Sequence, residues 1–148
     1  MREEKRAALI AYIPAGFPTV KDCHRVIQAF VDGGVDAIEI GFPYSDPVMD
    51  GPTIQEAAVT ALNNGTSAND VLDALEVAVN AGVPSVVMTY WNPIEKFGVK
   101  KFADAIAARG GSKPRRTSRV APACGHRATC RAAGYPCFPR SGRRGERF

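Results

Sequence analysis

The chain has 148 residues, of which 45% are hydrophobic, and a length that fits one ordinary globular domain. Residues 111–148 hold one Lys and nine Arg against the single acid Glu146, a net charge of +9, whereas residues 1–110 hold 9 basic and 14 acidic residues, a net charge of −5. No run is apolar over a membrane-spanning length, and the charged N-terminus lacks the apolar core of a signal peptide, so we expect a cytoplasmic protein without membrane contact. Only one of the four cysteines, Cys23, lies before residue 111, which excludes a disulfide framework there.

Short apolar runs and helical patterns alternate through the first 110 residues. Each apolar run is of strand length and is closed by proline, glycine or a polar loop, which is typical of buried parallel strands; these runs are residues 9–13, 37–40 and 85–90. Apolar residues recur at helical spacing between them and glycine follows, which predicts helices over 19–33, 54–63, 67–82 and 99–110. Ser67 and Asp70 form a capping-box-like start, and a loop is predicted from Trp91.

The order of these elements predicts an α/β fold with parallel strands. Its crossovers are long enough for right-handed units, which suits an open doubly wound sheet or the first part of an eight-stranded barrel. No Gly-rich phosphate fingerprint follows the first strand, so nothing favours a dinucleotide fold. In a barrel, Glu39 would point inward near the C-terminal rim, where barrel active sites lie.

Two carboxylates stand out. Glu39 lies inside an apolar strand and Asp50 lies at the far end of the following loop. Because burial of an unpaired carboxylate is costly, chemistry is a better reason for Glu39 than packing. The alternative for Glu39 is a structural acid paired with a cation, and for Asp50 it is an ordinary turn residue before Gly51.

Three segments carry a family resemblance. Residues 13–19 (Ile-Pro-Ala-Gly-Phe-Pro-Thr), 39–55 (from Glu-Ile-Gly-Phe-Pro-Tyr-Ser-Asp-Pro to Asp-Gly-Pro-Thr-Ile-Gln) and 88–93 (Met-Thr-Tyr-Trp-Asn-Pro) resemble the tryptophan synthase alpha subunit. The resemblance covers about residues 7–111. It implies that residues 1–110 are the first three β/α units of a (β/α)8 TIM barrel, incomplete in this chain.

The resemblance also implies an activity. The family is a lyase of tryptophan biosynthesis that cleaves indole-3-glycerol phosphate by a retro-aldol reaction to indole and glyceraldehyde 3-phosphate. It uses no cofactor and no metal in this subunit, and it passes indole to a beta subunit that carries pyridoxal phosphate, in an alpha2-beta2 heterotetramer. Protonation of indole C3 makes the ring an electron sink, so neither a metal nor a Schiff base is needed.

Residue roles follow from the matched positions. Glu39 would move protons between indole C3 and the hydroxyl on the carbon that is released, and Asp50 would hold the indole N–H. The matched indole-pocket positions, which could equally be core, are Tyr12, Met88 and Tyr90. The matched positions that contact the beta subunit and close the site are Asp46, Pro47 and Asn92, for which a solvated turn at residues 45–47 is the alternative.

The pattern changes after residue 110. Residues 111–148 contain no Leu or Ile, and we expect an aberrant or disordered Arg-rich tail without strands or helices. The third strand would then have an open edge, and the family's phosphate site, after the last barrel strands, would be missing. We therefore expect a poorly stable chain with little or no lyase activity. Our hypothesis is a shifted reading frame, and the alternative function is an inactive fragment that docks on the beta subunit.

Two remote alternatives concern the tail. Its arginines suit non-specific phosphate binding, but no nucleic-acid module is recognised and we predict no nucleic-acid partner. Four residues are of zinc-ligand type, although their spacing matches no usual zinc pattern; they are Cys124, His126, Cys130 and Cys137.

Overall fold

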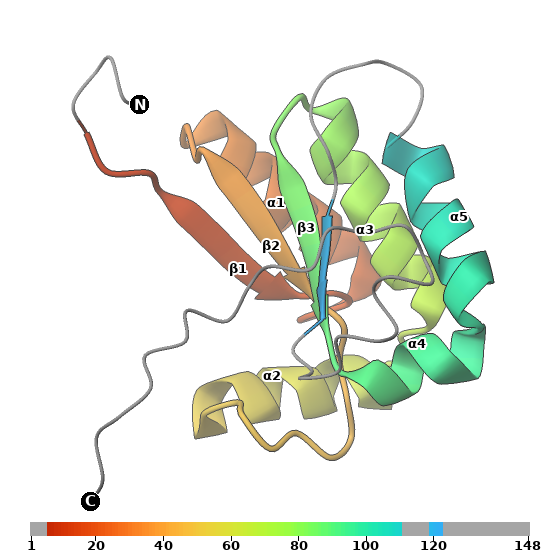
Figure 1. The fold of residues 1–148 in the computed structure, drawn as a ribbon. Coiled ribbons are helices and arrows are strands. Elements are labelled where there is room, and N and C mark those ends of the chain that lie inside the picture. The colour runs from red at the N-terminus through yellow and green to blue at the C-terminus, as the bar shows by residue number, and fades with distance from the viewer. Residues whose placement is uncertain (1–5, 111–118, 123–148) are drawn as a thin grey trace, which may run out of the picture.

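The computed structural model describes residues 6–110 and 119–122 as a single parallel sheet flanked by helices (Figure 1). The strands are β1 (Ile10–Pro14), β2 (Ala37–Gly41), β3 (Ser85–Thr89) and β4 (Arg119–Pro122), in the order β1-β2-β3-β4. The helices are α1 (Val20–Asp32), α2 (Pro52–Asn63), α3 (Ala68–Asn80), α4 (Trp91–Phe97) and α5 (Val99–Gly110). Every neighbouring pair of strands is parallel, so the predicted α/β architecture is confirmed.

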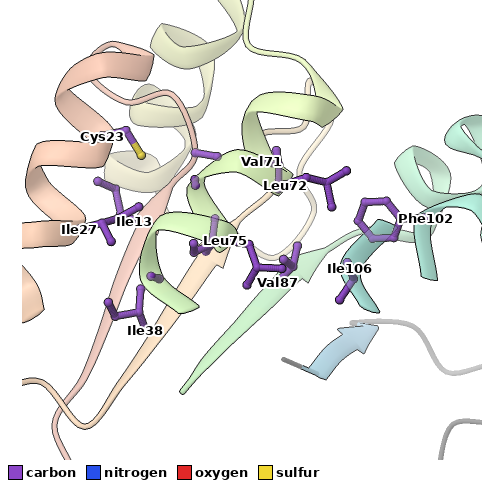
Figure 2. Packing of buried hydrophobic residues seen from close by; sticks show 14 of the residues in the cluster. Ile13, Cys23, Ile27, Ile38, Val71, Leu72, Leu75, Val87, Phe102 and Ile106 are labelled. Carbon is purple, nitrogen blue, oxygen red and sulfur yellow. The ribbon is translucent and has the colours of Figure 1, made fainter. Parts of the chain in front are cut away.

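The packing of the helices shows which face of the sheet is buried. Ile38 of β2 and Val87 of β3 are almost fully buried among side chains of α1, α3 and α5 (Figure 2). Ile40 of β2 belongs to the same buried cluster. Residues alternate between the two faces of a strand. Glu39 and Gly41 therefore lie on the opposite face of the sheet from the helices, where sequence alternation predicted them.

Local capping fixes where the helices begin. Thr19 caps α1, because its hydroxyl accepts the Asp22 N–H at 3.1 Å. The capping box predicted at the start of α3 is confirmed, since Asp70 accepts both the N–H and the hydroxyl of Ser67, at 2.7 and 2.6 Å. These bonds to Ser67 lower the pKa of Asp70.

An ion pair joins the segment before β1 to the start of β2. Arg6 Nη1 lies 2.6 Å from Asp36 Oδ2, which also accepts the N–H of Leu9 at 2.8 Å. The Arg6 guanidinium, and then the Leu9 N–H, lower the pKa of Asp36 to about 2. Asp36 therefore fixes the N-terminal ends of the first two strands against each other.

Two predictions of secondary structure were wrong. The segment from Trp91 is the helix α4 and not a loop, because Pro93 falls in the first helical turn, where no backbone N–H needs an intrahelical acceptor. The prediction that no strand follows residue 110 was also wrong: β4 pairs with β3 from Val86↔Arg119 to Thr89↔Pro122 and covers the edge that was expected to be open. The sequence Arg-Val-Ala-Pro lacks an apolar run, and strand pairing here uses backbone groups that no side-chain pattern reports.

No helix in the described ranges combines the length and the apolarity that crossing a bilayer requires.

Candidate active site

Glu39 lies on β2, on the face of the sheet away from α1, α3 and α5. Its register partner is Tyr12 on β1, and on β3 it is Val86. All three side chains are half-buried. In residues 6–110 no Lys or Arg forms an ion pair with Glu39, so the structure gives no support to the alternative of a charge-paired structural acid.

Both predicted carboxylates affect the pKa of the Tyr12 hydroxyl. Its pKa is raised to about 12, first because burial disfavours the phenolate and then because Asp50 and Glu39 place negative charge near it, with a smaller effect of Tyr90. Asp50 is eleven positions after Glu39 in the sequence, yet both act on the same hydroxyl. Asp50, Glu39 and Tyr90 are therefore all close enough to Tyr12 to raise the pKa of its hydroxyl.

Gly41 makes room for this arrangement. A Cβ built on Gly41 would stand 2.7 Å from Tyr12 Cζ and closer still to the Tyr12 hydroxyl. The ring of Tyr12 thus crosses from β1 over the backbone of β2, two residues after Glu39 along that strand. Met88, the third predicted pocket residue, is the register partner of Gly41 on β3 and is half-buried.

The loop between β2 and α2 is held against the end of β3. The Met49 N–H donates to the hydroxyl of Tyr90 at 3.0 Å, and the rings of Tyr44 and Tyr90 lie 5.1 Å apart between centroids. Asn92 Nδ2 donates to the Tyr44 hydroxyl at 2.7 Å. These contacts fix the segment that leads to Asp50. We call Tyr44, Met49, Tyr90 and Asn92 the loop clasp.

The residues predicted to contact a partner lie at the outer side of this loop. Asp46 is exposed and Pro47 is half-buried, and the two following apolar side chains, Val48 and Met49, are 81% and 73% exposed. Asn92 is exposed and already bound to Tyr44. A role of these residues at a partner interface stays a prediction.

Sequence reasoning did not single out Tyr44 or Val86. Val86 was foreseeable, because it is two positions before Met88 on the same strand and alternation puts both on one face. Tyr44 is an aromatic residue in a loop, and its partner Asn92 is 48 positions away, so no local signal joins them.

Across residues 6–110 and 119–122, no group of three His, Cys, Asp or Glu side chains has the arrangement of a metal site. The four zinc-ligand candidates, Cys124, His126, Cys130 and Cys137, lie outside the described residues. Cys23 is a buried residue of α1, and burial raises the pKa of its thiol.

Comparison with known proteins identifies the family. A family profile described as "Tryptophan synthase alpha chain" matches residues 1–112. The chain belongs to the tryptophan synthase alpha chain family. The tryptophan synthase alpha chain of Thermobifida fusca is 58% identical over 111 residues, and that of Acidothermus cellulolyticus is 54% identical over 111 residues.

Each of these alignments covers 75% of this chain but only 41% and 42% of the two relatives, so the chain spans about two fifths of the length of the curated relatives it matches. The fold is similar to a crystal structure of tryptophan synthase from M. tuberculosis in its aminoacrylate- and BRD0059-bound form, with a TM-score of 0.72 and 50% sequence identity. The superposed region covers 74% of this chain and 44% of the M. tuberculosis chain. A solved structure from Aquifex aeolicus has a TM-score of 0.76 at 32% sequence identity, and the match covers 89% of this chain and 51% of the Aquifex aeolicus chain. The described fold is therefore part of the family's (β/α)8 barrel.

Proposed function

We propose that the chain carries the acid–base half of a lyase site that cleaves indole-3-glycerol phosphate to indole and glyceraldehyde 3-phosphate in tryptophan biosynthesis. The observation that supports this most is Tyr12, which is the register partner of Glu39 and whose pKa is raised by burial and then by the charges of Asp50 and Glu39. The family membership of residues 1–112 supplies the reaction class.

Glu39 is the proposed proton-transfer residue. It lies on the face of the sheet away from α1, α3 and α5, without a neutralising cation from residues 6–110, which leaves its carboxylate free to exchange a proton with a ring bound there. In the proposed reaction Glu39 donates a proton to indole C3, and the resulting cationic ring accepts the electron pair of the breaking carbon–carbon bond. The hydroxyl on the departing carbon becomes the aldehyde and returns its proton to the carboxylate, so no group is consumed.

Asp50 complements this chemistry electrostatically. Protonation at C3 makes the indole nitrogen positive, and a carboxylate that accepts its N–H stabilises that charge. The loop clasp holds the backbone next to Asp50, and the Gln55 side chain donates to the Asp50 carbonyl oxygen at 2.8 Å. Tyr12, Met88 and Tyr90 then form the walls against which the ring packs.

A second function is favoured by the exposed loop. Val48 and Met49 are 81% and 73% exposed beside Asp46, and large exposed apolar side chains beside a held backbone mark interaction surfaces. In this alternative the chain is an inactive fragment that docks on the beta subunit, the partner in the family's alpha2-beta2 tetramer. Docking of this kind does not need the substrate-phosphate site that the family has in its later barrel loops.

One pair of measurements separates the two functions. Indole release from indole-3-glycerol phosphate is measured for the wild type and for Glu39→Gln, with Glu56→Gln on α2 as a matched control. Co-purification with a tagged beta subunit is measured for the wild type and for Val48→Asp. Release that depends on Glu39 supports the lyase, and docking that depends on Val48 without any release supports the fragment.

A further inference from the structure

Tyr44, near the start of the loop between β2 and α2, is held at two points by the start of α4. The Asn92 side-chain amide donates to its hydroxyl at 2.7 Å. The ring of Tyr90 lies 5.1 Å from its ring between centroids, with an angle of 32° between the two planes. Tyr90 is the N-cap of α4 and Asn92 is the second residue of that helix, so the helix fixes the spacing between the two contacts.

Tyr90 also holds the other end of the same loop. Its hydroxyl accepts the Met49 N–H at 3.0 Å, and Met49 directly precedes Asp50. On the other side of Asp50, the Gln55 side chain of α2 donates to the Asp50 carbonyl oxygen at 2.8 Å. The backbone of Asp50 is therefore fixed from two directions, by Tyr90 and by α2.

The position of the Asp50 carboxylate depends on this backbone. Asp50 is half-buried, and its charge is close enough to Tyr12 to raise the pKa of the Tyr12 hydroxyl. The hydrogen bonds that hold the segment involve backbone atoms, namely the Met49 N–H and the Asp50 carbonyl oxygen. The direction of the carboxylate therefore follows from where the backbone is placed.

We propose that Asn92 and Tyr44 are positioning residues that determine how well the site recognises a ring N–H. Without the Asn92 amide, the Tyr44 hydroxyl loses its donor and the Tyr44 ring is held by Tyr90 alone. Tyr90 then fixes Met49 less closely, and Asp50 moves with Met49. A misaligned carboxylate accepts an N–H poorly, because hydrogen bonds weaken steeply as their angle departs from linear. The inference rests on the proposed function of Asp50 as acceptor of the indole N–H.

The first test follows the backbone and needs no ligand. Amide hydrogen exchange at Met49 in the full 148-residue chain should be about threefold or more faster in Asn92→Ala and in Tyr44→Phe, as the loss of one hydrogen bond predicts. The double variant should exchange no faster than either single variant, because both changes break the same bond. Asn69→Ala is the matched control, since Asn69 is also an exposed second residue of a helix, α3.

The second test measures recognition of the ring N–H. Indene has nearly the shape of indole but carries a CH₂ group in place of the N–H, so the ratio of the two dissociation constants reports the N–H contact. In NMR titrations the wild type and Asn69→Ala should prefer indole, and Asp50→Ala should lose the preference. Asn92→Ala and Tyr44→Phe should lower it about threefold or more and leave the affinity for indene unchanged.

Asn92→Asp separates positioning from damage to the fold. Its carboxylate can accept the Tyr44 hydroxyl proton, so this variant should restore both slow exchange at Met49 and the preference for indole.

Unchanged exchange at Met49 in Asn92→Ala and Tyr44→Phe would overturn the proposal. A preference for indole that needs Asp50 but not Asn92 or Tyr44 would overturn it and leave the proposed function intact. A preference that is absent, or that Asp50→Ala retains, would overturn the function proposed for Asp50 and the recognition role with it.

Discussion

The ring of Tyr12 lies over the backbone of Gly41, so closely that a Cβ at Gly41 would overlap the Tyr12 hydroxyl. Tyr12 comes from β1 and Gly41 from β2, and Glu39 precedes Gly41 by two positions on the same face. The contact thus sets the distance between an aromatic wall of the site and its central carboxylate. Gly41 therefore has to lack a side chain for the Tyr12 ring to occupy this position.

Gly41→Ala should therefore destabilise the protein by displacing Tyr12. The expected loss is about 1–3 kcal/mol, the usual cost of overpacking. A double-mutant cycle with Tyr12→Ala, measured by urea unfolding, isolates the contact: Gly41→Ala should cost much less when Tyr12 is already truncated. Additive effects of the two changes would mean that the ring is not what fills this space.

Tyr12 should ionise far later than an ordinary tyrosine. Its pKa is raised from 10.0 to about 12, so the neutral phenol is favoured in the folded protein. Its contribution to stability is then complete below pH 10.0 and is lost as the pH rises toward about 12. Comparing the absorbance titrations of the wild type and of Tyr12→Phe should identify the ionisation of Tyr12. Asp50→Asn should lower the pKa of Tyr12, because it removes a nearby negative charge. A Tyr12 pKa that is indifferent to Asp50 would separate the two residues in space.

Asp36 should govern stability in acid. Its pKa is lowered from 3.8 to about 2 by Arg6 and by the Leu9 N–H, so its contribution is complete above pH 3.8 and is lost as the pH falls toward 2. Thermal melts of Asp36→Asn should show a lower melting temperature near neutral pH and a smaller further drop between these two pH values. Asp104→Asn breaks only an exposed pair with Lys100 and should behave as the wild type does.

The loop clasp should control the mobility of the segment before Asp50. Tyr90→Phe removes the acceptor of the Met49 N–H and keeps the ring that packs on Tyr44. The expected cost is about 0.5–1.5 kcal/mol, seen as faster hydrogen exchange at Met49. Tyr12→Phe also removes one hydroxyl but leaves the clasp intact, so Met49 should exchange there at the wild-type rate. Equal acceleration in both variants would argue against the clasp.

Sequence patterns predicted the helices that cover the sheet and the three strands from β1 to β3, because apolar side chains at strand and helix spacing report burial directly. They failed at α4 and β4. Pro93 resembled a loop signal but is tolerated in a first helical turn, and β4 is held by backbone pairing that leaves little trace in its side chains.

The candidate site was also predicted only in part from the sequence. Alternation along β2 predicted that Glu39 lies on the face away from the helices α1, α3 and α5, and the family resemblance supplied the role predicted for Asp50. The contact of Tyr44 with Asn92, and the approach of Tyr12 to Gly41, join segments that are distant in sequence. Only the folded chain brings these residues together, so sequence patterns could not predict them.

The most direct test of the proposed function is indole release from saturating indole-3-glycerol phosphate by the wild type, Glu39→Gln and Glu56→Gln. We predict slow release by the wild type, the same rate for Glu56→Gln, and a rate reduced about 100-fold or more for Glu39→Gln, the usual size of a general acid–base contribution. Release that is unchanged in Glu39→Gln, or no release by the wild type, would contradict the assignment of this site as a lyase.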